Sequence, residues 1–208
     1  MVVIYVDGVD GTGKSTLIGQ LVRHYPAHLA ITAPPLWRYL PSVPTPQAFP
    51  TWVTTTPAND IAAELLSAQR NRINDLHALG DHCQIVLVDR GPRTVEASAR
   101  AHLATKPPPE LSEATADLIA ELHTAARRLS AVHPCLSIEL ATTSYDEIIH
   151  RLTITERHDA AYLRYLRAFL HEFQSSASTS DPAPLVLRAD AHLHQNVTVA
   201  LRAVQALA

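Results

Sequence analysis

Several features are scarce or missing in this sequence of 208 residues, and each absence narrows the class of protein. The 17 basic residues do not outnumber the 20 acidic ones, and the formal charge of −3 argues against a surface that coats a nucleic acid polymer. No apolar run approaches the length of a membrane span. The first residues lack a charged segment followed by a long apolar one, so no signal peptide is expected. These absences predict a soluble, cytoplasmic protein that binds neither a nucleic acid polymer nor a membrane.

Cysteine is also rare. Cys83 and Cys135 lie beside or inside expected buried strands, and they do not form a CxxC pair. We interpret both as free, buried thiols in a reducing compartment. None of the 12 histidines stands in a tight metal-ligand spacing with them, so a site built from histidine and cysteine is not expected.

What the sequence does contain is an alternation of short apolar runs and helical patterns, with 47% apolar residues to form a core. The expected strands are 2–6, 28–32, 85–88, 135–140 and 185–187, and the expected helices are 17–22, 60–79, 111–129, 145–152, 162–173 and 197–204. Continuous apolar runs rich in β-branched residues are typical of strands that are buried on both faces. The pattern predicts one α/β domain over residues 1–208, with a parallel five-stranded sheet and helices on both faces.

Residues 33–57 interrupt this alternation with many prolines, which are expected to exclude a regular helix. Both tryptophans, Trp37 and Trp52, lie in this segment with Tyr39 and Phe49. These rings either stack on a flat acceptor molecule or anchor the segment to the core. Because a long loop inside a compact domain is usually functional, we interpret the segment as an insertion on the acceptor side.

Residues 8–15 read GVDGTGKS and match the pattern GxxxxGK[ST] completely, between an expected strand and an expected helix. Glycines let backbone N–H groups converge on phosphate oxygens, and the N-terminus of the following helix adds a positive field. In such a loop Lys14 bridges the β- and γ-phosphates and the Ser15 hydroxyl ligates Mg²⁺. The residues expected to contact the nucleotide are Gly8, Asp10, Gly11, Thr12, Gly13, Lys14, Ser15 and Thr16. The motif predicts a site for ATP and Mg²⁺ in a three-layer P-loop NTPase fold; an ordinary glycine turn is the alternative.

A second pair of charged residues, Asp89 and Arg90, follows the apolar run 85–88. This places them at the C-terminal edge of the sheet, where ligands bind in α/β proteins. Asp89 can hold Mg²⁺ through water or accept the proton of an acceptor hydroxyl, and Arg90 can clamp a phosphate. A solvated ion pair at the surface is the other interpretation. No NKxD tetrapeptide for guanine is present, which disfavours a GTPase.

Three further side chains are candidates for the acceptor site. Gln69 lies in the apolar stripe of helix 60–79 and needs a hydrogen-bond partner, which a base edge or a backbone carbonyl can supply. Arg70 either reaches the acceptor or solvates the helix surface. Arg93 is either a phosphate ligand or an exposed arginine without a function.

These motifs together resemble the thymidylate kinases and, more loosely, the deoxynucleoside kinases. Residues 7–16 look like the thymidylate-kinase form of the phosphate loop, residues 68–70 like its helix motif and residues 88–90 like its Asp-Arg motif. The resemblance implies that Arg70 meets the substrate base.

The resemblance extends to the C-terminal part of the chain. Residues 151–159 are similar to a short lid that begins at Arg151. The resemblance implies that Arg157 is the lid arginine, whose planar guanidinium contacts the transferred phosphoryl group. Residues 189–191 look like the loop that packs on the adenine, which implies that Asp190 lies beside the nucleotide.

One family element is missing. The loop Arg-Glu-Pro-Gly after the second strand is absent, and residues 32–37 are instead similar to the Glu-Pro…Trp segment of deoxynucleoside kinases. That likeness implies a substrate contact for Trp37. The catalytic glutamate of the segment would fall at Ala33, whose side chain cannot accept a proton.

The sequence therefore predicts an ATP-dependent phosphotransferase that acts on a nucleoside or a nucleoside monophosphate. Lys14, Arg90 and Arg157 would meet the transferred charge, and Asp89 would orient or deprotonate the acceptor. One alternative is a kinase for a specialised small molecule, such as a natural-product or antibiotic hydroxyl, which the insertion at 33–57 favours. A second is a regulatory nucleotide-binding module without turnover. The oligomeric state is left open, with a homodimer among the options.

Overall fold

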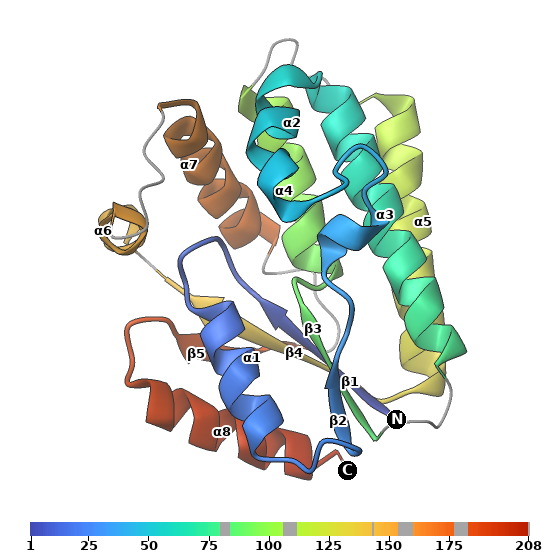
Figure 1. Cartoon of the computed structure of the whole chain (residues 1–208), viewed down its shortest axis with the longest axis vertical. Helices are drawn as coiled ribbons and strands as arrows, with labels where there is room; N and C mark the ends of the chain where they lie inside the picture. Colours follow the sequence, from blue (N-terminus) through green and yellow to red (C-terminus); the bar gives the residue numbers. More distant parts are fainter. Residues whose placement is uncertain (80–83, 106–111, 143, 154–159, 177–182, 208) are drawn as a thin grey trace.

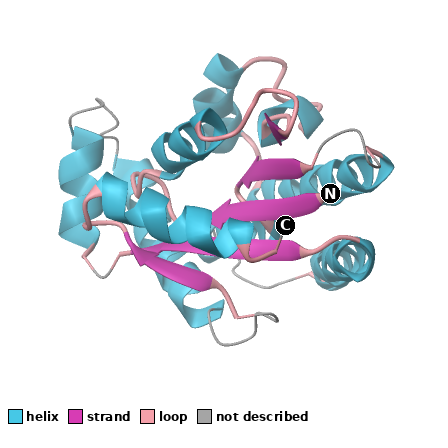
Figure 2. Cartoon of the chain, turned by 90° about the horizontal axis from the view of Figure 1, so that it is seen from below, coloured by secondary structure: helices cyan, strands magenta, loops and turns pink. Residues whose placement is uncertain are grey.

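The computed structural model of the chain describes residues 1–79, 84–105, 112–142, 144–153, 160–176 and 183–207. Its centre is a sheet of five parallel strands in the order β2-β3-β1-β4-β5. The strands are β1 Val2–Asp7, β2 Ala30–Thr32, β3 Ile85–Asp89, β4 Cys135–Ala141 and β5 Leu185–Arg188. Helices cover both faces of the sheet (Figure 2). The predicted three-layer α/β fold is confirmed.

Eight α-helices and two short 3₁₀ helices are found in the described part of the chain. The helices are α1 Lys14–Arg23, η1 Leu36–Tyr39, η2 Pro46–Ala48, α2 Phe49–Thr55, α3 Ala58–Ala78, α4 Pro92–Thr105, α5 Glu113–Val132, α6 Tyr145–Thr153, α7 Ala160–Ser175 and α8 Leu193–Gln205. Figure 1 shows α1 and α8 side by side on one face of the sheet, with α3, α4 and α5 on the other. None of the described helices is long and apolar enough to cross a membrane.

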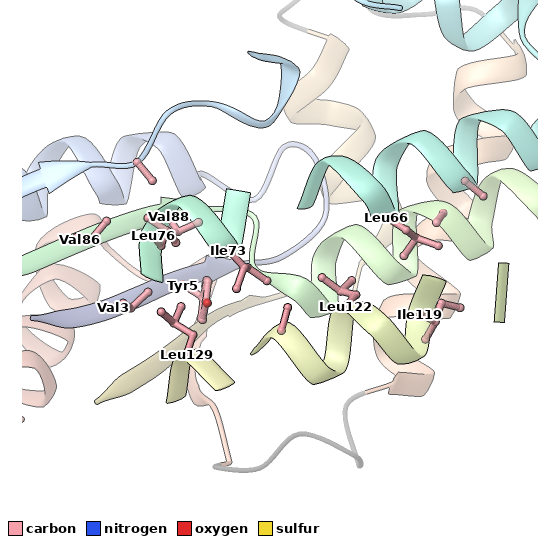
Figure 3. Packing of buried hydrophobic residues seen from close by; sticks show 14 of the residues in the cluster. Val3, Tyr5, Leu66, Ile73, Leu76, Val86, Val88, Ile119, Leu122 and Leu129 are labelled. Carbon is pink, nitrogen blue, oxygen red and sulfur yellow. The ribbon is translucent and has the colours of Figure 1, made fainter. Parts of the chain in front are cut away.

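The central strand β1 separates two apolar layers because its side chains alternate between the faces of the sheet. Val2, Ile4 and Val6 pack with α1 and α8, whereas Val3 and Tyr5 pack with α3 and α5. Figure 3 shows this second layer, in which Ile73 and Leu76 of α3 and Leu129 of α5 lie near the strand residues Val3 and Tyr5. All five of these residues are buried, so the strand that leads into the phosphate loop is held from both sides.

The structure corrects the expectation for residues 33–57. Instead of excluding helices, the segment forms η1, η2 and α2. A proline occupies the first turn of α2, where a missing N–H breaks no intrahelical hydrogen bond. Trp52, Leu40 and Val43 are buried against α3 and α4. For Trp52 the anchoring interpretation is therefore confirmed.

Helix α4 was not predicted, although its sequence carries a signal. Pro92 stands at its start, and Val95, Ala99 and Leu103 follow at intervals of four residues and are buried. Its many alanines give a weak apolar pattern. Of the two cysteines, Cys135 is a free and partly buried thiol, and Cys83 lies outside the described residues.

Candidate active site

The phosphate loop connects β1 to α1 at the C-terminal edge of the sheet, as the sequence predicted. Gly8 has a φ of 142°, and a Cβ there would lie 2.9 Å from the Thr12 hydroxyl and 3.0 Å from the Leu140 carbonyl oxygen. Gly13 is the N-cap of α1 in the left-handed conformation, with a φ of 94°. The loop therefore needs glycine for its backbone conformation and for its close packing against β4.

Lys14 begins α1 and folds back over the loop. Its Nζ donates a hydrogen bond of 2.8 Å to the carbonyl oxygen of Val9, and the residue is 6% exposed. Burial lowers the pKa of Lys14 to about 8. The ammonium group thus lies within the loop, where the phosphates of a nucleotide would lie in a P-loop protein.

Asp89 and Ser15 meet across the sheet edge. The Ser15 hydroxyl donates to Asp89 Oδ2 at 3.1 Å, although 74 residues separate them in the chain. Asp89 Oδ1 is buried and has no hydrogen-bond partner among the described residues. A carboxylate oxygen and a hydroxyl oxygen are ligands that suit Mg²⁺, which also takes waters and phosphate oxygens. The pair therefore fits the predicted magnesium site.

Arg90 adopts a left-handed backbone conformation with a φ of 67°, and no other non-glycine residue in the described ranges has a positive φ. Its Nη2 donates to Asp10 Oδ1 at 2.6 Å, and the Tyr162 hydroxyl donates to Asp10 Oδ2 at 3.2 Å. The Asp10 carboxylate raises the pKa of the Arg90 guanidinium above its ordinary value. The structure thus places Arg90 at the phosphate loop, and Asp10 fixes it there.

Asp7 is a site residue whose role sequence reasoning missed. It is 1% exposed and accepts three hydrogen bonds: from the Gly91 backbone N–H at 2.8 Å, the Thr94 hydroxyl at 2.5 Å and the Ser137 hydroxyl at 2.8 Å. These partners lie on the turn after β3, on α4 and on β4. Asp7 therefore ties the end of β3 to the phosphate loop. An acidic residue at the end of a buried apolar strand was the available signal.

We expect Gly91→Ala to destabilise the fold, because its Cβ would lie 2.7 Å from Asp7 Oδ2 and 2.9 Å from the Tyr5 Cβ. Overpacking of this kind costs about 1–3 kcal/mol, which urea unfolding measures. Gly19→Ala is the matched control, since a Cβ at this helical position of α1 meets no atom within 4 Å. It should leave the free energy of unfolding unchanged or raise it by about 0.5–1 kcal/mol. Equal losses in the two variants would contradict this account of the turn.

The three acceptor-side candidates have protein partners in the structure. Gln69 is fully buried, and its amide nitrogen lies 3.4 Å from the Arg90 carbonyl oxygen, whereas its Oε1 has no partner among the described residues. Arg70 forms an ion pair with Glu121 on α5. Arg70 is therefore directed toward α5, and its contact with the acceptor stays a prediction.

Arg93 is the third of these candidates, and its side chain is 10% exposed. It pairs with Glu139, donates to the Phe173 carbonyl oxygen at 2.8 Å and lies over the Phe173 ring. Through these contacts Arg93 joins α4 to β4 and α7, so it is not the exposed arginine of the second interpretation, and its role as a phosphate ligand stays a prediction. Trp37 is partly buried beside the cluster that anchors residues 33–57, with Arg38 over its ring.

The residues that the family resemblance indicated for the lid and for the adenine loop divide into three cases. Arg151 lines a small pocket with Gly11 and Thr12, and it donates to the Ala189 carbonyl oxygen at 3.0 Å. Asp190 is paired with Arg188 at the surface. Arg157 lies outside the described residues. The structure thus brings Arg151 to the phosphate loop.

Comparisons with known proteins identify solved structures with a similar fold. No protein-family model and no curated protein matches the sequence. Two solved structures of deoxyadenosine kinase from M. mycoides are similar over nearly the whole chain. One, with the products dCMP and a flexible dCDP bound, is 12% identical with a TM-score of 0.60, covering 98% of this chain and 99% of the other. The second, with dATP bound, is 10% identical with a TM-score of 0.62, covering 98% of each chain.

At these identities the likeness establishes a shared fold. The chain has the P-loop NTPase three-layer architecture that the phosphate loop predicted, in the form found in a deoxynucleoside kinase. The fold class is therefore P-loop NTPase, and what the chain does with it is argued from its own residues.

Proposed function

We propose that the chain is an ATP- and Mg²⁺-dependent phosphotransferase whose acceptor is a nucleoside or a nucleoside monophosphate. The observation that carries the proposal is the contact of Ser15 with Asp89 beside the phosphate loop, with Asp89 Oδ1 left unpartnered. A purely structural ion pair would satisfy both oxygens of a buried carboxylate. The contact of Arg90 with Asp10 is partly buried, which also differs from an exposed, solvated Asp-Arg turn.

In this proposal each residue has a role that follows from its place. Lys14 binds the β- and γ-phosphates, and Arg90 binds the phosphoryl group in transfer. Ser15 and Asp89 would hold Mg²⁺, which when bound neutralises charge on the phosphates. Asp89 either holds that ion or takes the proton of the acceptor hydroxyl. Ala33 is 5% exposed and its N–H donates to the Leu87 carbonyl oxygen, so this position supplies no carboxylate, whereas Asp89 has an oxygen without a partner among the described residues.

Two observations support a nucleoside as the acceptor over thymidylate. The first is the fold shared with a deoxyadenosine kinase whose structures contain dCMP, dCDP and dATP. The second is that Arg70, which the thymidylate-kinase resemblance assigned to the base, pairs with Glu121. The thymidylate-kinase-like activity remains the finer alternative within this reaction class.

A kinase for a specialised small molecule is the second candidate function. The segment 33–57 favours it, because this segment forms η1, η2 and α2 and packs against α3, whose Gln69 and Arg72 contact the backbone of Asp89 and Arg90. A pre-organised wall of this kind restricts which acceptors fit. A nucleotide-binding module without turnover would share the phosphate loop but would show no dependence on an acceptor.

Release of ADP across a panel of acceptors separates these functions. The panel contains the deoxynucleosides, their monophosphates and sugar-like alcohols, each with ATP and Mg²⁺. The proposal predicts a rate that rises with one class of nucleoside or nucleotide. A rate that rises only with other alcohols would support the second candidate, and a rate that no acceptor changes would leave a binding module.

If Trp37 lines the acceptor site, Trp37→Leu should raise the acceptor KM several-fold, equivalent to about 0.5–1.5 kcal/mol of lost stacking, while the KM for ATP stays unchanged. Trp52→Leu is the control, because Trp52 is 6% exposed and packs in the anchoring cluster. It should lower thermal stability more than it changes the acceptor KM. An acceptor KM that Trp37→Leu leaves at the wild-type value would remove this residue from the site.

A further inference from the structure

One buried cation near the site has no role in the proposed reaction. Arg72 lies on α3, is 1% exposed and is among the largest fully buried side chains of the described chain. Burying a guanidinium is unfavourable unless its donors are satisfied. Its Nη1 donates to the Asp89 carbonyl oxygen at 3.0 Å, and its Nη2 donates to the Arg90 carbonyl oxygen. The buried fork therefore holds two consecutive carbonyls.

Those two carbonyls belong to the turn that carries the candidate catalytic side chains. Arg90 is held at a φ of 67°, which a residue with a side chain adopts only when its surroundings favour it. Its backbone N–H donates to the Val6 carbonyl oxygen at 3.1 Å, and Gln69, one turn from Arg72, points its amide at the Arg90 carbonyl. The turn is thus fixed from β1 on one side and from α3 on the other.

Fixing this backbone fixes the directions of two side chains. From it, the Asp89 carboxylate reaches the Ser15 hydroxyl at 3.1 Å and the Arg90 guanidinium reaches Asp10 at 2.6 Å. The φ of Arg90 sets the direction of its own guanidinium, and the contact of Arg72 with the Asp89 carbonyl fixes the peptide that follows the Asp89 carboxylate. An arginine suits this task, because its planar fork presents two parallel N–H donors, whereas a lysine presents a single ammonium group.

We propose that Arg72, supported by Gln69, is a positioning residue that holds the turn of Asp89 and Arg90 in its left-handed form and so sets the metal-binding carboxylate. The role rests on the proposed function of the site. Arg72 acts through the backbone of its neighbours and does not contact the nucleotide.

Three variants test the proposal. Arg72→Met keeps the length of the side chain and removes both donors; Arg72→Lys keeps the charge and one donor group. Leu122→Ala is a stability control: Leu122 of α5 is fully buried in the apolar cluster with residues of α3 and α4, and Figure 3 shows it apart from the labelled strand residues Val86 and Val88. Thermal unfolding gives the stability of each, and a titration of Mg²⁺ with N-methylanthraniloyl-ADP gives the half-saturating Mg²⁺ concentration for nucleotide binding.

For Arg72→Met we expect a half-saturating Mg²⁺ concentration about tenfold above the wild-type value or more, because the carboxylate no longer faces Ser15. Nucleotide affinity without Mg²⁺ should change little, and Arg72→Lys should fall between. Leu122→Ala should lower the melting temperature and leave the Mg²⁺ requirement unchanged. A wild-type Mg²⁺ requirement in Arg72→Met, or an equal rise in Leu122→Ala, would overturn the proposal. If Arg72→Met does not fold, a wild-type requirement in Arg72→Lys overturns it.

A double-mutant comparison makes the test specific to Asp89. If Arg72 acts through this carboxylate, Arg72→Met should change the Mg²⁺ requirement far less in a protein that already carries Asp89→Asn. Additive effects would contradict the proposal. Because these readouts are binding measurements, a protein that binds nucleotide with Mg²⁺ and transfers to no acceptor would count against the proposed function alone.

Discussion

A Lys14→Met variant is expected to keep its fold and to lose about 10³-fold in kcat for phosphoryl transfer. Lys14 Nζ lies within the phosphate loop, 2.8 Å from the Val9 carbonyl oxygen, and its stem is buried. Methionine replaces the stem with a side chain of similar length, so the change removes charge rather than packing. In a water-excluded site an ammonium group stabilises the charge of the transferring phosphoryl group far more than it does in water.

The measurement is acceptor-dependent turnover, with circular dichroism as the check of the fold. Arg23→Met is the matched control, since Arg23 is an exposed cation in the last turn of the same helix. It should retain the wild-type rate. Turnover near the wild-type level in a folded Lys14→Met protein would remove the phosphate loop from the reaction.

Asp89→Asn should lower kcat by about 10²-fold or more, with a much smaller change in nucleotide affinity measured without Mg²⁺. The substitution preserves shape but removes the negative charge and the acceptor capacity of Oδ1, which has no partner among the described residues. Both proposed roles of Asp89, ion holder and proton acceptor, need that charge.

The dependence of rate on Mg²⁺ distinguishes these two roles. If Asp89 holds the ion, the variant should recover part of its rate at high Mg²⁺; if Asp89 is the base, Mg²⁺ should not restore it. Asp60→Asn, in the exposed first turn of α3, is the control. If Asp89→Asn lowered kcat and the Mg²⁺-free nucleotide affinity by the same factor, Asp89 would be a structural carboxylate, and both roles would be contradicted.

The parts of the site that could be predicted from sequence are those with a local pattern. Apolar β-branched runs located β1 and β3, and the spacing of residues 8–15 identified the loop between β1 and α1. The position of Asp89 and Arg90 beside this loop could also be predicted, because the C-terminal ends of parallel strands meet at one edge of the sheet. Each of these features is fixed by residues that are close together in the chain.

The parts that were missed depend on contacts between distant residues. Asp7 receives hydrogen bonds from residues 84, 87 and 130 positions away, and no local pattern indicates those partners. Arg72 lies near the edge of the apolar stripe of α3, a position where an arginine is usually solvated, and its two carbonyl partners follow only from the packing of α3 on β3. Arg70, two residues earlier, faces α5 because successive helical residues point in different directions.

The acceptor side was the least predictable, for a physical reason. Prolines in residues 33–57 indicated an irregular segment, yet a proline in the first turn is compatible with the helix α2. The apolar contacts of Trp52 and Leu40 with α3 then order the segment. Composition indicates where a regular pattern stops, but tertiary packing decides what replaces it.

The central claim is that the chain transfers the terminal phosphoryl group of ATP to a nucleoside or nucleotide. The most direct measurement follows the γ-phosphate of isotopically labelled ATP into product, for the wild-type protein and for Lys14→Met, with Mg²⁺ and the panel of acceptors. We expect the label to appear in a phosphorylated nucleoside or nucleotide with the wild-type protein and to be absent with the variant. Label that appears only in inorganic phosphate, or product formed equally by both proteins, would contradict the claim.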